Sequence, residues 1–223
     1  MTPGARFQVF IDFDNTISRG DVLDAVIARF ARSDAWRALE EDWVAGRIGA
    51  RACLEGQVRN LRADWPAMES FLQTAELDPG FAGLVACLRD ASVELTIVSD
   101  NFDRFIGTVL ARHDFADLAV RANHVELVGD TIEPSFPYFD PGCPGCAHCK
   151  KSHFTPRRDE RRVVYIGDGL SDVCPASRAD LVFAKASLLR HRQRHGLPCR
   201  PFGDLSAVTH ELRTILHENQ SRG

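Results

Sequence analysis

The 223-residue chain has no apolar run long enough to span a bilayer. It also has no secretory n-region at its start, because the apolar segment that follows residues 1–6 is short and ends in Asp12. An excess of positive charge is missing as well: 27 Lys and Arg residues stand against 31 Asp and Glu residues, for a net charge of -4. Electrostatics therefore give no case for nucleic acid or an acidic membrane as a partner, and we expect a cytoplasmic protein.

Internal repeats and low-complexity segments are also absent, so we expect one ordinary domain, or one domain that carries a small insertion. The hydrophobic fraction of 44% is ample for a packed core. The seven cysteines are an odd number. Without a secretory segment, that number favours reduced thiols or metal ligands over a disulfide framework.

Short apolar runs rich in Val and Ile alternate with helix-like stretches along most of the chain. This alternation predicts an α/β fold, a Rossmann-like parallel sheet with helices on both faces. Ligands of such sheets bind beyond the carboxyl ends of the strands. The predicted strands are residues 7–11, 93–98, 118–120, 162–166 and 181–184, and the predicted helices between them include residues 81–90 and 102–112.

Residues 21–77 interrupt the alternation, because their apolar residues recur at helical spacing throughout. We expect this helical insert after the first strand to form a cap; extra helices packed on one face are the alternative. A β-hairpin is predicted at 124–133, with its turn at Gly129-Asp130, and the Arg-rich stretch 190–195 is expected to be a solvated helix face. The predicted division is a core at residues 1–18 and 80–223, a cap at 19–79, and a hairpin and cysteine-rich insert in the core at 122–149.

The most informative segment reads FIDFDNT, residues 10–16. An apolar run leads to Asp12 and Asp14 at the end of a strand, and alternation places both carboxylates on one side, with Phe13 pointing the other way. Two close carboxylates repel each other unless a cation lies between them or one of them is protonated. The pair indicates a magnesium site, a nucleophile beside an acid, or both. A strand that ends in an Asx turn is the plain structural alternative.

Three further elements follow in order: Ser99 after an apolar strand, then Lys150 or Lys151, then the run GDGLSD at residues 167–172. Each is weak by itself, because GDGxxD is also a glycine turn and a serine is also a helix N-cap. Together, and in this order, they resemble the haloacid dehalogenase superfamily of phosphatases, from residue 8 to about 184. The helical insert after the first motif resembles the cap of the phosphoserine phosphatase group.

The resemblance implies a role for each carboxylate. Asp12 is the expected nucleophile that forms an aspartyl-phosphate, and Asp14 the expected acid that protonates the leaving oxygen and later accepts a proton from water. Magnesium is expected at Asp12, Asp14 (through its backbone carbonyl) and Asp168, with Asp172 supporting the metal through water or orienting Asp168.

The phosphoryl oxygens are expected to be bound by Ser99, Asp100 and a lysine. Lys150 is favoured over Lys151 because it directly follows Cys149, as in the most similar families. The chain resembles two such families. One is the methionine-salvage phosphatases, which act on 2-hydroxy-3-keto-5-methylthiopentenyl-1-phosphate, and the other is the phosphoethanolamine/phosphocholine phosphatases. Asp21 occupies the position where phosphoserine phosphatases carry an acid for the substrate's ammonium group, although an acid at a helix N-terminus is an equal alternative.

The cysteine-rich loop contains Cys143, Cys146 and Cys149 at the C-x-x-C-x-x-C spacing of a metal knuckle. Thiolates at this spacing can converge on a structural zinc ion, with His148, His153 or His124 as candidate fourth ligands. Reduced thiols packed in the loop, or a redox-sensitive pair, are the alternatives.

Taken together, these features predict a magnesium-dependent phosphomonoesterase that acts on a small phosphorylated metabolite. Phosphoryl transfer to an acceptor alcohol with the same site is one alternative. A non-catalytic zinc-binding or ligand-binding module on this fold is another, and the oligomeric state cannot be inferred from the sequence.

Overall fold

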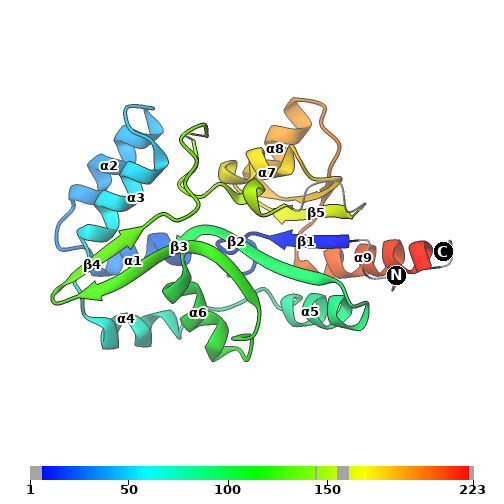
Figure 1. The fold of residues 1–223 in the computed structure, drawn as a ribbon, viewed down its shortest axis with the longest axis horizontal. Helices are drawn as coiled ribbons and strands as arrows, with labels where there is room; N and C mark the ends of the chain where they lie inside the picture. The colour runs from blue at the N-terminus through cyan, green and yellow to red at the C-terminus, as the bar shows by residue number, and fades with distance from the viewer. Residues whose placement is uncertain (1–6, 144, 155–160, 221–223) are drawn as a thin grey trace. The chain divides into compact units, whose positions relative to one another are not determined.

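The computed structural model describes residues 7–143, 145–154 and 161–220 (Figure 1). Residues 1–6, which we interpreted as unlike a secretory n-region, and Pro144 of the cysteine motif lie outside the described residues. Contacts between Cα atoms divide the chain into two compact units. The first unit contains Met1–Arg19, Glu76–Val98 and His153–Gly223; the second contains Gly20–Ala75 and Ser99–Ser152.

The first unit is built on a parallel sheet with the strand order β2-β1-β5-β6-β7. All five residues of β1 are buried, as expected for a central strand that is covered on both faces. The chain alternates between strands and helices here, which confirms the predicted α/β class. The strands are β1 (Phe7–Ile11), β2 (Glu94–Phe102), β5 (Arg162–Gly167), β6 (Leu181–Ala184) and β7 (Arg200–Pro201).

Helices of the first unit bury one apolar side each, and α5 packs against α9. In α5 the buried residues recur at spacings of three and four, which is the pattern from which the helix was predicted. The helical elements are α5 (Phe81–Asp90), the 3-10 turn η4 (Leu170–Asp172), α7 (Val173–Ala176), α8 (Ala186–Arg194) and α9 (Leu205–Gln220).

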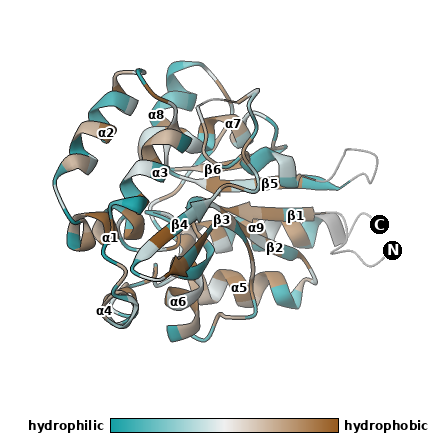
Figure 2. Ribbon diagram, turned by 60° about the vertical axis from the view of Figure 1, so that its left-hand side comes forward, coloured by the Kyte–Doolittle hydropathy of each residue, from teal (hydrophilic) through white to brown (hydrophobic). Residues whose placement is uncertain are grey.

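The second unit contains the helical insert, the hairpin and the loop that leads to Lys150. Hydrophobic (brown) and hydrophilic (teal) residues alternate along α2 (Figure 2). The Leu39 side chain of α2 packs closely against Gly56 of α3, because a Cβ at Gly56 would lie only 2.7 Å from it. The elements are α1 (Val22–Phe30), α2 (Ala35–Val44), α3 (Ala50–Arg59), α4 (Trp65–Leu72), α6 (Asp103–Arg112), β3 (Ala119–Val128), β4 (Thr131–Ser135) and the 3-10 helix η2 (Lys150–His153).

The predicted hairpin is confirmed: β3 and β4 are antiparallel, with Val128 opposite Thr131 and a turn at Gly129, whose φ of 57° suits glycine. The predicted strand at 118–120 and the first hairpin strand are one continuous strand, β3. The division into core, cap and insert stays a prediction. By compactness alone, segments 20–75 and 99–152 group together.

Arg192 contradicts the expectation that the Arg-rich stretch is a solvated helix face. Its side chain is only 6% exposed, and its guanidinium donates to the carbonyl of Ala176 at 3.0 Å and to that of Pro198 at 2.6 Å. The planar guanidinium can donate to two carbonyls at once, so the side chain of one arginine of the stretch is buried and not solvated. Within the described part of the chain, no helix combines the length and apolar composition that a membrane span requires.

Candidate active site

Three buried carboxylates of the first unit converge on one point. Oxygen atoms of Asp12, Asp168 and Asp172 all lie within 4.8 Å of one another. Their strands explain this: Asp12 follows β1, Asp168 follows β5, and the two strands are parallel neighbours with Ile11 opposite Ile166. The Asp12 amide continues the ladder by donating to the Ile166 carbonyl at 2.9 Å. Side chains that follow adjacent parallel strands therefore meet at one edge of the sheet.

The turn after β1 is closed by the carbonyl of Phe13, which accepts from the amides of Thr16, Ile17 and Ser18. Asn15 sits in the left-handed region with a φ of 56°, where asparagine is better tolerated than most residues. Strand alternation therefore ends at Ile11, and Asp14 is a half-buried turn residue outside the three-carboxylate cluster. Its predicted role as acid and base stays a prediction.

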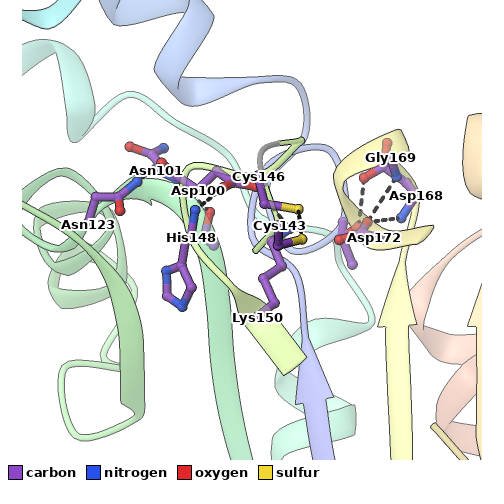
Figure 3. A network of polar contacts seen from close by, with 12 residues as sticks. Asp100, Asn101, Asn123, Cys143, Cys146, His148, Lys150, Asp168, Gly169 and Asp172 are labelled. Carbon is purple, nitrogen blue, oxygen red and sulfur yellow. Dashed lines mark hydrogen bonds and ion pairs between the residues drawn. The ribbon is translucent and has the colours of Figure 1, made fainter. Parts of the chain in front are cut away.

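Asp172 holds the turn that carries Asp168. One of its oxygens accepts from the amides of Asp168 and Gly169, both at 2.9 Å, and the other accepts from the Tyr165 hydroxyl at 2.5 Å (Figure 3 shows the two amide contacts). Gly167 leaves room for this carboxylate, since a Cβ there would be 2.7 Å from the Asp172 Cγ. This geometry fits the orienting role that the resemblance implied.

The cluster fits a hard divalent cation. Three buried carboxylates supply oxygen ligands of the kind Mg²⁺ prefers, and a cation between them relieves their mutual repulsion. Thr16 adds a further link, because its hydroxyl donates to Asp168 Oδ1 at 3.0 Å. Among the described residues, Asp12, Asp168 and Asp172 are the acidic, His or Cys side chains whose ligand atoms lie close enough together to hold one metal ion.

The residues expected to bind the phosphoryl group belong to the second unit. Ser99 is 1% exposed, and its hydroxyl oxygen accepts from the Asn101 amide at 3.1 Å. Lys150, at the start of η2, is 2% exposed, and its Nζ lies 3.8 Å from Asp100 Oδ2 (Figure 3). Lys151 is less deeply buried. A buried lysine needs charged or polar partners, which Lys150 has in Asp100.

Asp21 is the N-cap of α1, and its carboxylate accepts from the Asp24 amide at 2.9 Å. The structure thus confirms the capping alternative, while a contact with a substrate stays a prediction. Burial, with the charge of Asp24 as the second cause, raises the pKa of Asp21 to about 6; the nearby Lys150 acts in the opposite direction.

We expect Asp21→Asn to stabilise the protein at neutral pH but not at pH 4. Above pH 6 the wild-type protein carries a buried charge in the folded state, whereas near pH 4 the carboxyl is largely protonated in the folded state and only about half ionised in the unfolded chain, so the charge costs little there. The gain in free energy of unfolding should therefore grow between pH 4 and 6 and reach about 1–3 kcal/mol, while asparagine keeps the cap. Urea unfolding at several pH values measures this.

Asp64→Asn is the matched control, because Asp64 also caps a helix, accepting from the Ala67 amide at 3.2 Å, but is exposed. Because its charge is already in contact with water, Asp64→Asn should give no gain in the free energy of unfolding at neutral pH. A gain for Asp21→Asn that is the same at pH 4 and pH 7 would contradict the prediction.

The cysteine loop does not support the predicted zinc ion. Cys143 Sγ lies 3.6 Å from Cys146 Sγ, whereas Cys149 Sγ contacts Asp140 Oδ2 at 3.8 Å. His124, a candidate fourth ligand, instead contacts Asp103 at 2.8 Å and Glu126 at 3.4 Å. Burial raises the pKa of the Cys149 thiol, which opposes its conversion to the thiolate that zinc requires. Zinc at Cys143, Cys146 and Cys149 stays an unsupported prediction.

The sequence did not predict the contacts that four residues make near these groups. Thr16 and Tyr165 bind the carboxylates, and Asn123 and His148 lie beside Asp100. Tyr165 is buried in β5, seven residues before Asp172. In the sequence it stands inside an apolar run, which predicts a strand but not a hydrogen bond to Asp172. Asn123 stands one residue before the predicted hairpin, and no local pattern indicates its contact with the Asp100 carbonyl.

Known proteins resemble this chain along nearly all of its length. A family model described as Putative Phosphatase matches residues 7–192. A protein of Brevibacillus brevis, named 2-hydroxy-3-keto-5-methylthiopentenyl-1-phosphate phosphatase, is 30% identical over 224 residues, which cover 96% of this chain and 97% of that protein. A protein of the same name from Geobacillus kaustophilus is 30% identical over 215 residues, covering 94% and 97%.

The solved structures show the same fold. Phosphoserine phosphatase from T. onnurineus, in complex with NDSB-201, has a TM-score of 0.67 and 17% sequence identity, and the match covers 96% of this chain and 98% of that one.

Proposed function

The chain belongs to the Putative Phosphatase family, within the haloacid dehalogenase superfamily, and from this premise we propose that it is a magnesium-dependent phosphomonoesterase that works through an aspartyl-phosphate. The observation that carries the proposal is the buried cluster of Asp12, Asp168 and Asp172 at the ends of adjacent parallel strands. A phosphomonoester is a dianion, and its hydrolysis depends on positioning and on neutralisation of charge.

Asp12 is the proposed nucleophile. Its carboxylate attacks phosphorus, and the bond from phosphorus to the leaving oxygen breaks. Asp14 protonates that oxygen and then accepts a proton from the water that hydrolyses the aspartyl-phosphate. Asp12 and Asp168 would hold Mg²⁺, while Asp172 fixes the backbone at Asp168 and Gly169. When bound, the ion supplies positive charge that offsets the charge of the phosphoryl oxygens.

Ser99 and Lys150 are the proposed donors to the phosphoryl oxygens. The burial of Lys150 supports its choice over Lys151. A buried lysine ammonium group needs anionic partners in place of water, and a phosphoryl group is such a partner. The substrate we favour is an enol-phosphate of the kind named for the Brevibacillus and Geobacillus relatives, because these two proteins match 96% and 94% of the chain. An amino-alcohol phosphate is the second candidate, supported by the acidic Asp21 in the same unit as Lys150.

We expect magnesium-dependent release of inorganic phosphate from a panel of small phosphomonoesters, and no release with EDTA. The panel contains the enol-phosphate, phosphoserine, phosphocholine, phosphoethanolamine and a sugar phosphate. The fastest substrate identifies the substrate class. Assays with and without an acceptor alcohol separate hydrolysis from phosphotransfer. A folded protein that releases phosphate from none of them, with magnesium present, would refute the proposal.

A further inference from the structure

A connected set of contacts surrounds Asp100, all within the second unit (Figure 3). Its Oδ1 accepts from the His148 amide at 2.8 Å, and its Oδ2 lies 3.8 Å from the Nζ of Lys150. Its own backbone carbonyl accepts from the Asn123 side-chain amide at 2.6 Å. One aspartate thus links the end of β2, the strand β3 and the loop that presents Lys150.

The chemistry of a carboxylate argues against a direct contact between Asp100 and a phosphoryl group. An ionised carboxylate only accepts hydrogen bonds, and so do the oxygens of a phosphate dianion. Two such groups repel each other unless a cation or a donor lies between them. Lys150 is a cation close enough to Asp100 to form an ion pair with it. Ser99, the residue before Asp100, differs from it because its hydroxyl can donate to phosphate.

The loop that leads to Lys150 also contacts Tyr138, in addition to Asp100. His148 is fully buried, and its ring lies 4.8 Å from the ring of Tyr138. The Cys149 amide donates to the Tyr138 carbonyl at 2.9 Å. Asn123 is also fully buried, and the carbonyl it contacts requires its amide nitrogen at that position. The backbone of residues 148 and 149 is therefore held from two sides immediately before Lys150.

We propose that Asp100 is a positioning residue that acts through Lys150, with Asn123 fixing the Asp100 backbone, and is not itself a phosphate ligand. This proposal rests on the proposed function, in which Lys150 binds the phosphoryl group. It differs from the expectation that the resemblance gave, where Asp100 was grouped with the residues that bind phosphate. Asp100 keeps the ammonium group of Lys150 in place and offsets its charge while the site is empty.

A double-mutant cycle on the magnesium-loaded protein tests this inference, with Asp100→Ala, Lys150→Ala and the combination. We expect Asp100→Ala to lower kcat/KM about 10- to 100-fold in the wild-type background and to change it less than about threefold in the Lys150→Ala background. The inhibition constant of inorganic phosphate should follow the same pattern. Independent factors that multiply in the double variant would overturn the inference, because a separate phosphate ligand would act without Lys150.

Two further variants keep the test decisive. Asp100→Asn retains an acceptor for the His148 amide, so it should fold even where Asp100→Ala does not, and its effect should also disappear without Lys150. Asp103→Ala is the matched control, because it removes another aspartate that pairs with a base in this unit, His124 at 2.8 Å. It should leave kcat/KM within about threefold, and its effect should multiply with that of Lys150→Ala.

The result separates the two proposals. If the wild-type protein releases no phosphate, the proposed function fails, and this inference fails with it. If the wild-type protein is active and the effects of Asp100→Ala and Lys150→Ala multiply, only the inference fails.

Discussion

Replacing Asp12 by asparagine is expected to abolish magnesium-dependent phosphate release, with a loss of roughly ten-thousand-fold or more in kcat. The amide of asparagine is not a nucleophile at neutral pH and cannot form an aspartyl-phosphate. The substitution leaves the shape of the residue almost unchanged, so Ile11 and the turn at Phe13 keep their positions. Phosphate release measured at saturating substrate and magnesium gives the loss directly.

The same variant should be no less stable than the wild-type protein when EDTA is present. Asp12 is 6% exposed and shares a buried cluster with two other carboxylates, so removing its charge relieves repulsion. Asp180→Asn is the matched control: the Asp180 carboxylate accepts from the Val163 amide at 2.8 Å, and asparagine retains that acceptor. The control should keep full activity. An Asp12→Asn protein that is folded and retains a tenth of the activity would contradict the role of nucleophile.

Replacing Asp172 by alanine is expected to cost about 3–5 kcal/mol of folding free energy. Asp172 is fully buried and accepts from two amides and one hydroxyl, and alanine leaves all three donors without this partner. The turn that carries Asp168 then loses its anchor. Urea unfolding in EDTA measures the loss of stability, and unfolding with increasing magnesium measures how much of the stabilisation by the ion remains.

Two milder variants distinguish anchoring from charge. Asp172→Asn keeps one acceptor oxygen, so it should lose less stability than Asp172→Ala. Tyr165→Phe removes one donor and should cost about 1 kcal/mol, with little additional cost in the Asp172→Ala background, since the two groups share one hydrogen bond. If Asp172→Ala unfolds at the wild-type urea concentration, Asp172 does not anchor the turn.

The elements of this fold with strong local patterns were predictable to the residue. The bounds of β1, β6 and α5 agree with those expected, because each is an apolar run or an amphipathic stretch of ordinary length. The end of β2 was not: the strand continues to Phe102, through the polar Ser99, Asp100 and Asn101, because tertiary pairing overrides the low strand propensity of these residues.

The candidate site shows the same contrast. Asp12, Asp168 and Asp172 stand in short motifs whose order along the chain is informative, and the structure brings their oxygens together. The contacts of Asn123 with Asp100 and of Thr16 with Asp168 join positions 23 and 152 residues apart, and no local pattern indicates them. Arg192 was misjudged for the same reason, because its partners are backbone carbonyls that a sequence does not display.

The division into two compact units has an optical consequence. The three tryptophans of the chain, Trp36, Trp43 and Trp65, all belong to the second unit, and the first unit contains none. Intrinsic tryptophan emission is thus a built-in label for the unit that carries Lys150, and it is blind to the unit that carries the carboxylates. Emission recorded together with far-ultraviolet circular dichroism therefore reveals whether the chain melts in one step or in two.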